Sequence, residues 1–338
     1  MKSDKRNARR RNARRIAATT VASGLLAAGA LALTTSAASA STLSTQSHAT
    51  SYTFAIHDNA KDLTFNQLLG INDEGVIAGY FGSGAAGHPN KGYVLLPPYG
   101  QGNYINENFP GSVQTQVTGL NNRGVTVGFW SNTNKGVGQD ANFGFVEANG
   151  QFRTADFPTG NPANPPTDQL LGVNDENVAV GFYTDGAGTN HGYEYNIRSN
   201  HFSSVVDPNA PAASLTAAAI NDEGDVAGFY TNPAGTTDGF LKTHHGQFID
   251  LAVPGAASTM ALGVDSSDEV VGVYTVGSGS TAAMHGFTWT ARHGFSTVDD
   301  PLGAGTTTIN GVNDRGQLVG FYVDSAGNTD GFLATPQH

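Results

Sequence analysis

One repeated set of polar side chains in this sequence can converge on shared chemistry. His191, Asp238, His285 and Asp330 each stand directly before a Gly and an aromatic residue, in four copies of one repeat. If the repeats form a ring, equivalent positions lie at equal radius and height, so this position is the candidate for ligand binding, metal binding or acid-base chemistry. The alternative is that each side chain bonds to the backbone of its own hairpin and stabilises it.

A calcium site is a second hypothesis, because oxygen-bearing side chains recur in the loops before this position. Residues 185–191 and 324–330 supply Asp185, Asp324 and Asp330. Calcium prefers several converging oxygen ligands, but the EF-hand spacing with its distal Glu is absent from these loops. Asp, Asn and Gly are also the residues that hairpin loops select. We therefore expect no metal, and keep calcium at these three residues as the alternative.

No residue stands out as catalytic. Asp156, Asp207, Asp299 and Asp300 lie just before prolines; a glycosidase needs two facing carboxylates, but Asp near Pro is also a turn signal. The sequence contains no Gly-x-Ser-x-Gly, His-Glu-x-x-His or phosphate-loop lysine motif. The absence of cysteine excludes thiol nucleophiles and thiolate metal sites. We expect no catalytic residues and no cofactor.

These residues belong to a unit that occurs six times. The copies run from GINDEGVIAGYF at residue 70 to GVNDRGQLVGFY at residue 311, and their anchor glycines are 49, 53, 47, 44 and 48 residues apart. A period near 48 residues is typical of arrays and propellers. The anchors are Gly79, Gly128, Gly181, Gly228, Gly272 and Gly320.

Each repeat predicts four short antiparallel strands. Asn-Asp-x-Gly between apolar runs favours a hairpin, a Gly-aromatic pair marks a third strand, and an aromatic residue six positions before a Pro marks a fourth. Residues of both faces are apolar after the turn, as in Val125, Val127 and Trp130, which indicates sheets packed between neighbours. A Gly in such a strand lets an aromatic ring lie against bare backbone. We expect Trp130 and Trp289 to pack within the sheets; the alternative is that they form platforms on which sugars stack.

The phase of the repeat indicates how the ends meet. The fourth-strand signature precedes the first copy, around Phe54, whereas the last copy stops after Phe332. If the N-terminal segment supplies the strand that the last copy lacks, the exposed sheet edges disappear. The sequence therefore predicts an all-β fold, a six-bladed β-propeller over residues 51–338, closed by this pairing; a β-solenoid or stacked hairpins are the alternatives.

At these motifs the sequence resembles the HAF-repeat family of probable extracellular repeat proteins, in which Gly-Ile-Asn-Asp-x-Gly-x-Val-Val-Gly-x-Tyr is followed by His/Asp-Gly-Phe-Leu. The resemblance covers about residues 52–333. His191 and His285 match the family's His, and Asp238 and Asp330 its Asp, whereas Lys91 and Phe143 depart from the pattern. The resemblance implies export and repeated structure, and it implies no reaction.

The first forty residues predict a secretory signal. Arg9, Arg10 and further arginines precede an apolar stretch from Ile16 to Leu33, and Ala38-Ser39-Ala40 is a cleavage pattern. Residues 41–50 read as a flexible linker. The alternative is one membrane anchor, but Thr, Ser and Gly dilute the stretch. The absence of cysteine suits the surface or medium of a bacterium.

Removal of the signal leaves an acidic chain with 9 Lys+Arg and 27 Asp+Glu, a formal net charge of −18. Such a chain is a poor ligand for nucleic acid or anionic membranes, which require clustered Lys and Arg. A neutral glycan or a cell-envelope protein remains as partner, and we expect a monomer. The sequence thus predicts a secreted, non-catalytic binding protein that uses loops at one end of the ring; the alternative is a polysaccharide hydrolase or lyase with its site at the channel mouth.

Overall fold

The computed structural model describes residues 50–211 and 213–337. The predicted signal, residues 1–40, and residues 41–49 of the predicted linker lie outside the described residues. The described chain consists of strands and loops, with two three-residue 3-10 helices at Gln101–Asn103 and Gly279–Thr281. The predicted all-β class is confirmed. Across the described ranges, no helix has the length and apolar character needed to cross a membrane.

Antiparallel pairing connects the strands four at a time, and we number the resulting units along the chain. Unit 1 contains β2 (Asn66–Ile71), β3 (Ile77–Phe81), β4 (Lys91–Leu95) and β5 (Tyr104–Asn106). Unit 2 contains β6 (Gln114–Leu120), β7 (Thr126–Ser131), β8 (Phe143–Ala148) and β9 (Gln151–Thr154). Unit 3 contains β10 (Asp168–Val173), β11 (Val178–Thr184), β12 (Asn190–Asn196) and β13 (His201–Val205).

Units 4 to 6 follow the same plan. Unit 4 contains β14 (Ser214–Ile220), β15 (Val226–Thr231), β16 (Thr237–Lys242) and β17 (Phe248–Leu251). Unit 5 contains β18 (Ser258–Val264), β19 (Val270–Val276), β20 (Ala283–Thr290) and β21 (Gly294–Thr297). Unit 6 contains β22 (Thr308–Val312), β23 (Leu318–Val323), β24 (Thr329–Pro336) and β1 (Tyr52–Ile56). One parallel pair, Thr237 with Ser258, also joins units 4 and 5. The predicted antiparallel sheets of four strands are confirmed.

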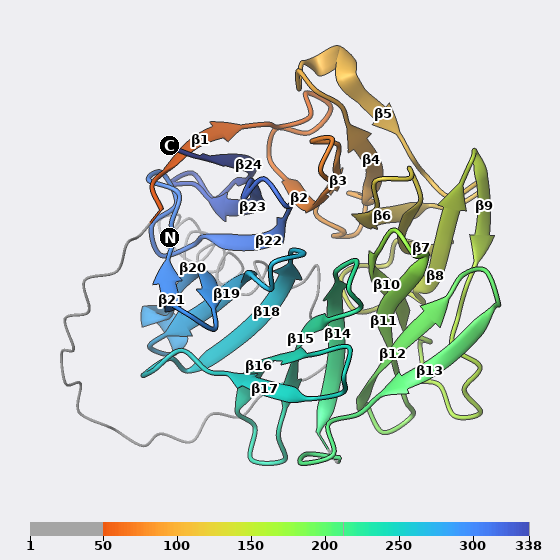
Figure 1. The fold of residues 1–338 in the computed structure, drawn as a ribbon. Helices are drawn as coiled ribbons and strands as arrows, with labels where there is room; N and C mark the ends of the chain where they lie inside the picture. Colours follow the sequence, from red (N-terminus) through yellow and green to blue (C-terminus); the bar gives the residue numbers. More distant parts are fainter. Residues whose placement is uncertain (1–49, 212, 338) are drawn as a thin grey trace, which may run out of the picture.

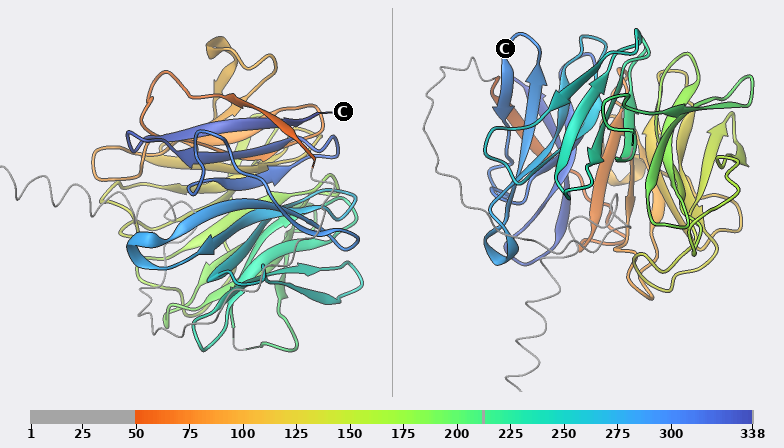
Figure 2. Two further views of the ribbon diagram at one scale, coloured as in Figure 1. Left: turned by 90° about the vertical axis from the view of Figure 1, so that its left-hand side faces the viewer. Right: turned by 90° about the horizontal axis from the view of Figure 1, so that it is seen from below.

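The two ends of the described chain meet in unit 6. β1 runs antiparallel to β24, from Tyr52 opposite Pro336 to Ile56 opposite Phe332. The ring of Phe54 packs edge-on against that of Phe332, with centroids 5.3 Å apart. Figure 2 shows the red-orange N-terminal strand lying beside the blue C-terminal strands. This is the pairing that the sequence predicts for these two segments.

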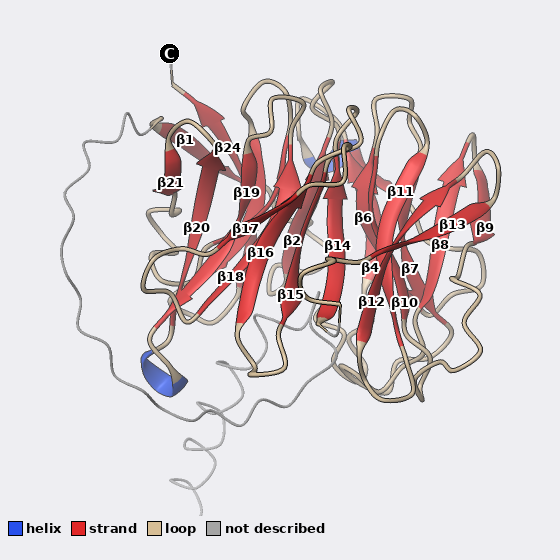
Figure 3. Ribbon diagram, turned by 60° about the horizontal axis from the view of Figure 1, so that its bottom comes forward, coloured by secondary structure: helices blue, strands red, loops and turns tan. Residues whose placement is uncertain are grey.

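The units lie around a common centre (Figure 1). The second strand of each unit contacts the first strand of the next, from β3 with β6 through β19 with β22, and β23 contacts β2. Because neighbouring strands are antiparallel, their connections gather at two opposite ends (Figure 3). The end with the turns from first to second strand is called the Asn-turn end. The opposite end, with the loops from second to third strand and from unit to unit, is called the loop end.

The anchor glycine of the second strand makes room for an aromatic ring of the third strand. A Cβ atom at Gly320 would lie 2.8 Å from the ring of Phe332, and one at Gly228 would lie 2.7 Å from that of Phe240. Both phenylalanines are completely buried. Since real Cβ atoms do not approach neighbours this closely, only glycine permits this packing of the sheet.

At five of the six Asn turns, an asparagine links its unit to the next. Asn121, for example, uses its side-chain carbonyl to accept from the amides of Arg123 and Val125 and so closes its own turn. Its Nδ2 donates to the backbone carbonyl of Asn174 in the next unit, at 2.9 Å. The same inter-unit bond runs from Asn72 to Asn121, from Asn174 to Asn221, from Asn221 to Asp265 and from Asn313 to Asn72.

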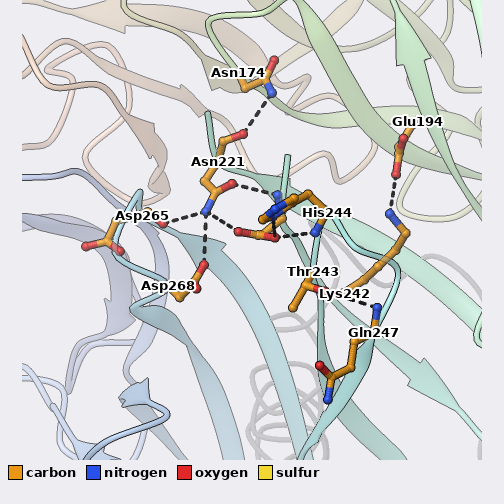
Figure 4. A network of polar contacts seen from close by, with 10 residues as sticks. Asn174, Glu194, Asn221, Lys242, Thr243, His244, Gln247, Asp265 and Asp268 are labelled. Carbon is orange, nitrogen blue, oxygen red and sulfur yellow. Dashed lines mark hydrogen bonds and ion pairs between the residues drawn. The ribbon is translucent and has the colours of Figure 1, made fainter. Parts of the chain in front are cut away.

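Asp265 takes the asparagine position in unit 5 and keeps half of its role. Its carboxylate accepts from the amides of Ser267 and Glu269, so the turn is intact. A carboxylate has no N–H group, and its side chain therefore cannot donate to the carbonyl of Asn313 in unit 6. Figure 4 shows the preceding links from Asn174 to Asn221 and from Asn221 to Asp265.

We expect Asp265→Asn to stabilise the protein by about 1 kcal/mol, because it supplies the missing donor toward Asn313. The mirror change, Asn121→Asp, removes an existing link and should lower the free energy of unfolding by ~1–2 kcal/mol. Urea denaturation at pH 7 measures both. Asp62→Asn is the matched control, because Asp62 forms a turn with Thr64 at the loop end. If the Asp265→Asn protein is no more stable than the parent, the inter-unit hydrogen bond of the Asn turn does not contribute to stability as proposed.

Candidate functional site

The four residues of the predicted ring position begin third strands at the loop end. They stand opposite tyrosines of their own second strands: His191 with Tyr183, Asp238 with Tyr230, His285 with Tyr274 and Asp330 with Tyr322. They therefore occupy one repeated position on units 3 to 6. The third strand is separated from the centre of the ring by the first and second strands of the same unit.

Both histidines bond to a carboxylate of their own unit. Nε2 of His191 lies 2.9 Å from Oδ2 of Asp185, and Nδ1 of His285 lies 2.7 Å from Oδ2 of Asp299. Each imidazole is thereby held on its own hairpin. The hydrogen bond from His191 also lowers the pKa of Asp185, with further help from loop amides.

The two aspartates at this position lie near polar groups of their own units. Burial raises the pKa of Asp238, and the charge of Asp250 in the same unit adds to this effect. Burial also raises the pKa of Asp330, although the hydroxyl of Tyr322 lowers it in part. In residues 50–211 and 213–337, no hydrogen bond or ion pair joins two of the four ring-position residues. The histidines bond to side-chain carboxylates, whereas the alternative predicts bonds to the backbone of the hairpin. A shared site and a hairpin-stabilising role at this position both stay predictions.

The carboxylates of the calcium hypothesis complete turns in their own loops. Asp185 accepts from the amides of Ala187 and Thr189, and Asp324 accepts from those of Ala326 and Asn328. Within the described part of the chain, no group of three or more His, Asp or Glu side chains is arranged to hold a metal ion. Calcium at Asp185, Asp324 and Asp330 also stays a prediction.

The aspartates near prolines bond to the chain around them. Asp156 accepts from the amide of Gly144 at 2.8 Å, and Asp299 accepts from that of Gly286 at 3.2 Å. Burial raises the pKa of Asp156 to about 6. Asp207 and Asp300 accept from amides two residues ahead. These bonds fix turns between units.

The Asn-turn end has an acidic mouth with an empty volume of about 420 Å³, lined by the Asn turns of all units. Asp73, Asp175, Asp222 and Asp314 contribute carboxylates there, and each accepts from the backbone amide of a neighbouring unit. Burial raises the pKa of Asp222, and Asp175 adds to this effect through its charge. These carboxylates therefore serve first as inter-unit acceptors.

A different pocket lies at the loop end, between units 1, 2 and 3. Its empty volume is about 610 Å³, part of which is open to solvent. Uncharged amides and aromatic rings dominate its lining, and Asp140 adds one carboxylate. We call it the amide pocket and define it by Tyr80, Asn90, Gln116, Trp130, Asp140 and Gln169.

Two glutamines on the first strands of units 2 and 3, the strands nearest the common centre, have a hydrogen-bonded side-chain nitrogen and an unpaired side-chain oxygen. Nε2 of Gln116 donates to Oδ1 of Asn90 at 2.9 Å, and Nε2 of Gln169 donates to Oδ1 of Asn142 at 2.7 Å. Both side chains are buried, and both Oε1 atoms lack a hydrogen-bond partner. A buried acceptor without a partner costs about 1–3 kcal/mol, so a site that leaves two of them beside a pocket is suited to a ligand that donates hydrogen bonds.

Trp130 contributes a fixed aromatic surface to the same pocket. Its ring stacks on Phe109 with centroids 4.4 Å apart and planes 2° apart. The indole N–H is buried and has no acceptor. Trp130 therefore packs within unit 2, as the sequence predicts, and also lines the pocket.

A long loop of unit 2 forms one wall of the amide pocket. Asp140 organises it by accepting from the hydroxyl of Thr133, the amide of Lys135 and Nε2 of Gln114. Asn134 reaches across to unit 1, where it donates to the carbonyl of Gly84. These bonds hold the loop in place without apolar packing.

The amide pocket is absent from the sequence-based hypotheses, although the sequence contains a signal for it. Gln116 and Gln169 share one inner-strand position with Gln67 of unit 1, whereas units 4 to 6 carry Thr216, Met260 and Thr308 there. A glutamine at this position in three consecutive units is the signal that the sequence contains.

One ring-position residue does lie beside a cavity. His191, Tyr183 and Asp207 line a pocket with an empty volume of about 380 Å³ between units 3 and 4. Imidazole, phenol and carboxylate groups are those that acid-base chemistry uses.

No family model and no curated protein matches the chain. Among solved structures, a virginiamycin B lyase from Staphylococcus aureus is 9% identical, with 84% of this chain and 99% of that chain covered and a TM-score of 0.47. A fungal lectin described as a six-bladed β-propeller, from Aleuria aurantia, is 11% identical over 79% of this chain and 90% of that chain, with a TM-score of 0.47. At this level of likeness, neither the reaction of the lyase nor the ligand of the lectin transfers to this chain.

Asp168, the neighbour of Gln169 in the sequence, is a buried carboxyl group whose protonation affects the stability of the fold. Its carboxylate accepts from the hydroxyl of Tyr193 at 2.5 Å and from the amide of Phe157 at 2.8 Å. Burial raises the pKa of Asp168 to about 8, although these two bonds lower it in part. The folded protein therefore retains a proton that the unfolded chain releases near the ordinary pKa of 3.8.

The stabilising contribution of this proton is complete below the ordinary pKa and is lost as the pH rises to about 8. We expect the free energy of unfolding to fall between pH 5 and pH 8.5, and Asp168→Asn to reduce that fall by on the order of 2 kcal/mol. Urea denaturation at the two pH values measures it. Glu74→Gln, at an exposed carboxyl, is the control. If the free energy of unfolding falls as much in Asp168→Asn as in the parent, the pH dependence does not come from Asp168.

Proposed function

We propose that this chain is a secreted, monomeric, non-catalytic six-bladed β-propeller. It binds extracellular material, a neutral glycan or a cell-envelope protein, through the loop end of the ring. Each four-stranded unit is one blade. The chain belongs with the HAF-repeat proteins that its motifs resemble.

Closure of the ring is supported by bonds between the first and last units. Asn313 donates to the carbonyl of Asn72, and the amide of Asp314 donates to Asp73. Unit 6 also takes its fourth strand from the N-terminal segment. An open solenoid would leave these groups of units 1 and 6 apart, so the same contacts argue against that alternative.

The observation that carries the binding proposal is the amide pocket. It combines planar amides with aromatic rings, the set of groups that binds neutral, hydroxyl-rich ligands.

Export and acidity narrow the class of partner. The predicted signal, cleaved after Ala40, places the protein outside the cell, and the formal net charge of −18 after cleavage disfavours nucleic acids and anionic membranes. A neutral polymer is not repelled by this negative charge, and an envelope protein is accessible to an exported chain.

The alternative function is a hydrolase or lyase that acts on a polysaccharide. The pocket of His191, Tyr183 and Asp207 is the observation that favours it, and the channel mouth is the second location where carboxylates gather. Turnover of neutral and acidic polysaccharides, measured before and after chelation, tests this alternative. Product formation that His191→Ala abolishes would replace the binding proposal with catalysis.

We expect the purified protein to be retained on at least one immobilised neutral polysaccharide or envelope fraction. Trp130→Ala should weaken retention about tenfold or more, since loss of an aromatic contact surface typically costs more than 1 kcal/mol. Trp289→Ala makes the same truncation in unit 5 and serves as the control, with circular dichroism to verify folding. No retention of the parent protein on any polysaccharide or envelope fraction counts against the proposal.

A further inference from the structure

Three unpartnered polar groups gather around the amide pocket. Among the described residues, buried side-chain atoms without a hydrogen-bond partner include Oε1 of Gln116, Oε1 of Gln169 and Nε1 of Trp130, and these three residues line this one pocket. Native proteins leave few buried polar groups unpaired, because each costs about 1–3 kcal/mol. Their concentration at one pocket points to a ligand that pairs with them.

The orientation of these groups is fixed before any ligand binds. The amide nitrogens of Gln116 and Gln169 are held by Asn90 and Asn142, so rotation of either side chain breaks a hydrogen bond. The indole of Trp130 is held by its stack on Phe109. Prearranged groups lose little conformational entropy on binding, which favours affinity for a small ligand.

The three groups define the polar chemistry of the ligand. Two carbonyl oxygens require two donors, and one indole N–H requires one acceptor. Hydroxyl groups supply both, and a sugar ring presents several of them around its edge while its C–H face packs against an aromatic ring. Tyr80 and Phe129 extend the aromatic surface of Trp130 around the pocket. Sugar rings therefore match this lining in polarity.

The charge of the pocket selects among sugars. Asp140 is the one acidic residue of the lining, and no Lys or Arg lines the pocket in the part of the chain that the structure describes. A uronate or sulfate group placed there would meet a carboxylate without a compensating cation. The lining therefore suits an uncharged sugar.

We propose that the amide pocket binds a single uncharged sugar residue. Two of its hydroxyls donate to Gln116 Oε1 and Gln169 Oε1, and one of its oxygens accepts from the indole N–H of Trp130. This inference rests on the proposed function, because it identifies the ligand class and the subsite of a glycan-binding protein. It adds a prediction of which atoms of the chain discriminate between sugars.

Titration calorimetry with methyl glycosides of glucose, galactose, mannose and N-acetylglucosamine, and with glucuronate and galacturonate, tests the inference. We expect at least one neutral glycoside to bind and both uronates to bind at least about tenfold more weakly. Gln116→Met, Gln169→Met and Trp130→Phe keep the shape of each side chain and remove one polar group. Each should weaken binding roughly fivefold to tenfold.

Two further variants guard against loss of folding. Thr308→Val is the matched control, because Thr308 occupies the repeat position of Gln116 in unit 6, also has an unpartnered buried oxygen and does not line the pocket. It should leave binding unchanged. Val137→Arg changes an exposed residue of the pocket wall, with 42% of its surface accessible, so the fold is retained while the pocket entrance is obstructed. It should abolish binding.

The outcomes separate this inference from the proposed function. If the parent protein binds a neutral glycan and the three polar variants and Val137→Arg bind it equally well, the pocket is the wrong subsite while glycan binding stands. If the uronates bind more tightly than the neutral glycosides, the ligand class is wrong. If the parent binds an envelope protein and no sugar, or binds nothing, the inference fails, and in the last case the proposed function fails with it.

Discussion

The two-sided hydrogen bonding of asparagine at the Asn turn is the interaction on which the arrangement of the units depends. The side-chain carbonyl of Asn121 closes a turn within unit 2, while its amide group donates to the backbone of Asn174 in unit 3. One side chain therefore determines both the local hairpin and the position of the neighbouring sheet. Asp265 shows the separation of these roles, because a carboxylate closes the turn and has no proton to donate to the next unit.

The two ends hold the units together in different ways. The Asn turns have to keep the same length and geometry to reach their neighbours, whereas at the loop end the inter-unit bonds come from residues at the starts of strands, as from Thr115 to Asn90 and from Met284 to Gly305. The loops beyond those residues can therefore differ in length. The connection between β7 and β8 spans residues 132–142, while that between β11 and β12 spans residues 185–189. The longer loop, held by Asp140 and Asn134, closes one side of the amide pocket. A pocket arises between units 1, 2 and 3 because the loops there depart from the repeat.

The sequence-based site hypotheses and the amide pocket draw on different residues. His191 and His285 recur at one position of the repeat, and each bonds to a carboxylate of its own unit. The amide pocket instead draws on Gln116 and Gln169. Their signal in the sequence is a glutamine that units 1 to 3 share at one inner-strand position and that units 4 to 6 replace with Thr or Met.

The sequence by itself determined the all-β class, the antiparallel sheets of four strands and the partnership of the Phe54 and Phe332 segments, because turn residues and apolar alternation report local hydrogen bonding directly. It also determined the acidic charge of the chain. Only the tertiary structure decided which side chains meet at one pocket. Tyr80, Gln116 and Gln169 lie on three different units, and their approach depends on the distance of each strand from the centre and on the path of a long loop. Those are properties of the assembled units, and no local pattern of residues encodes them.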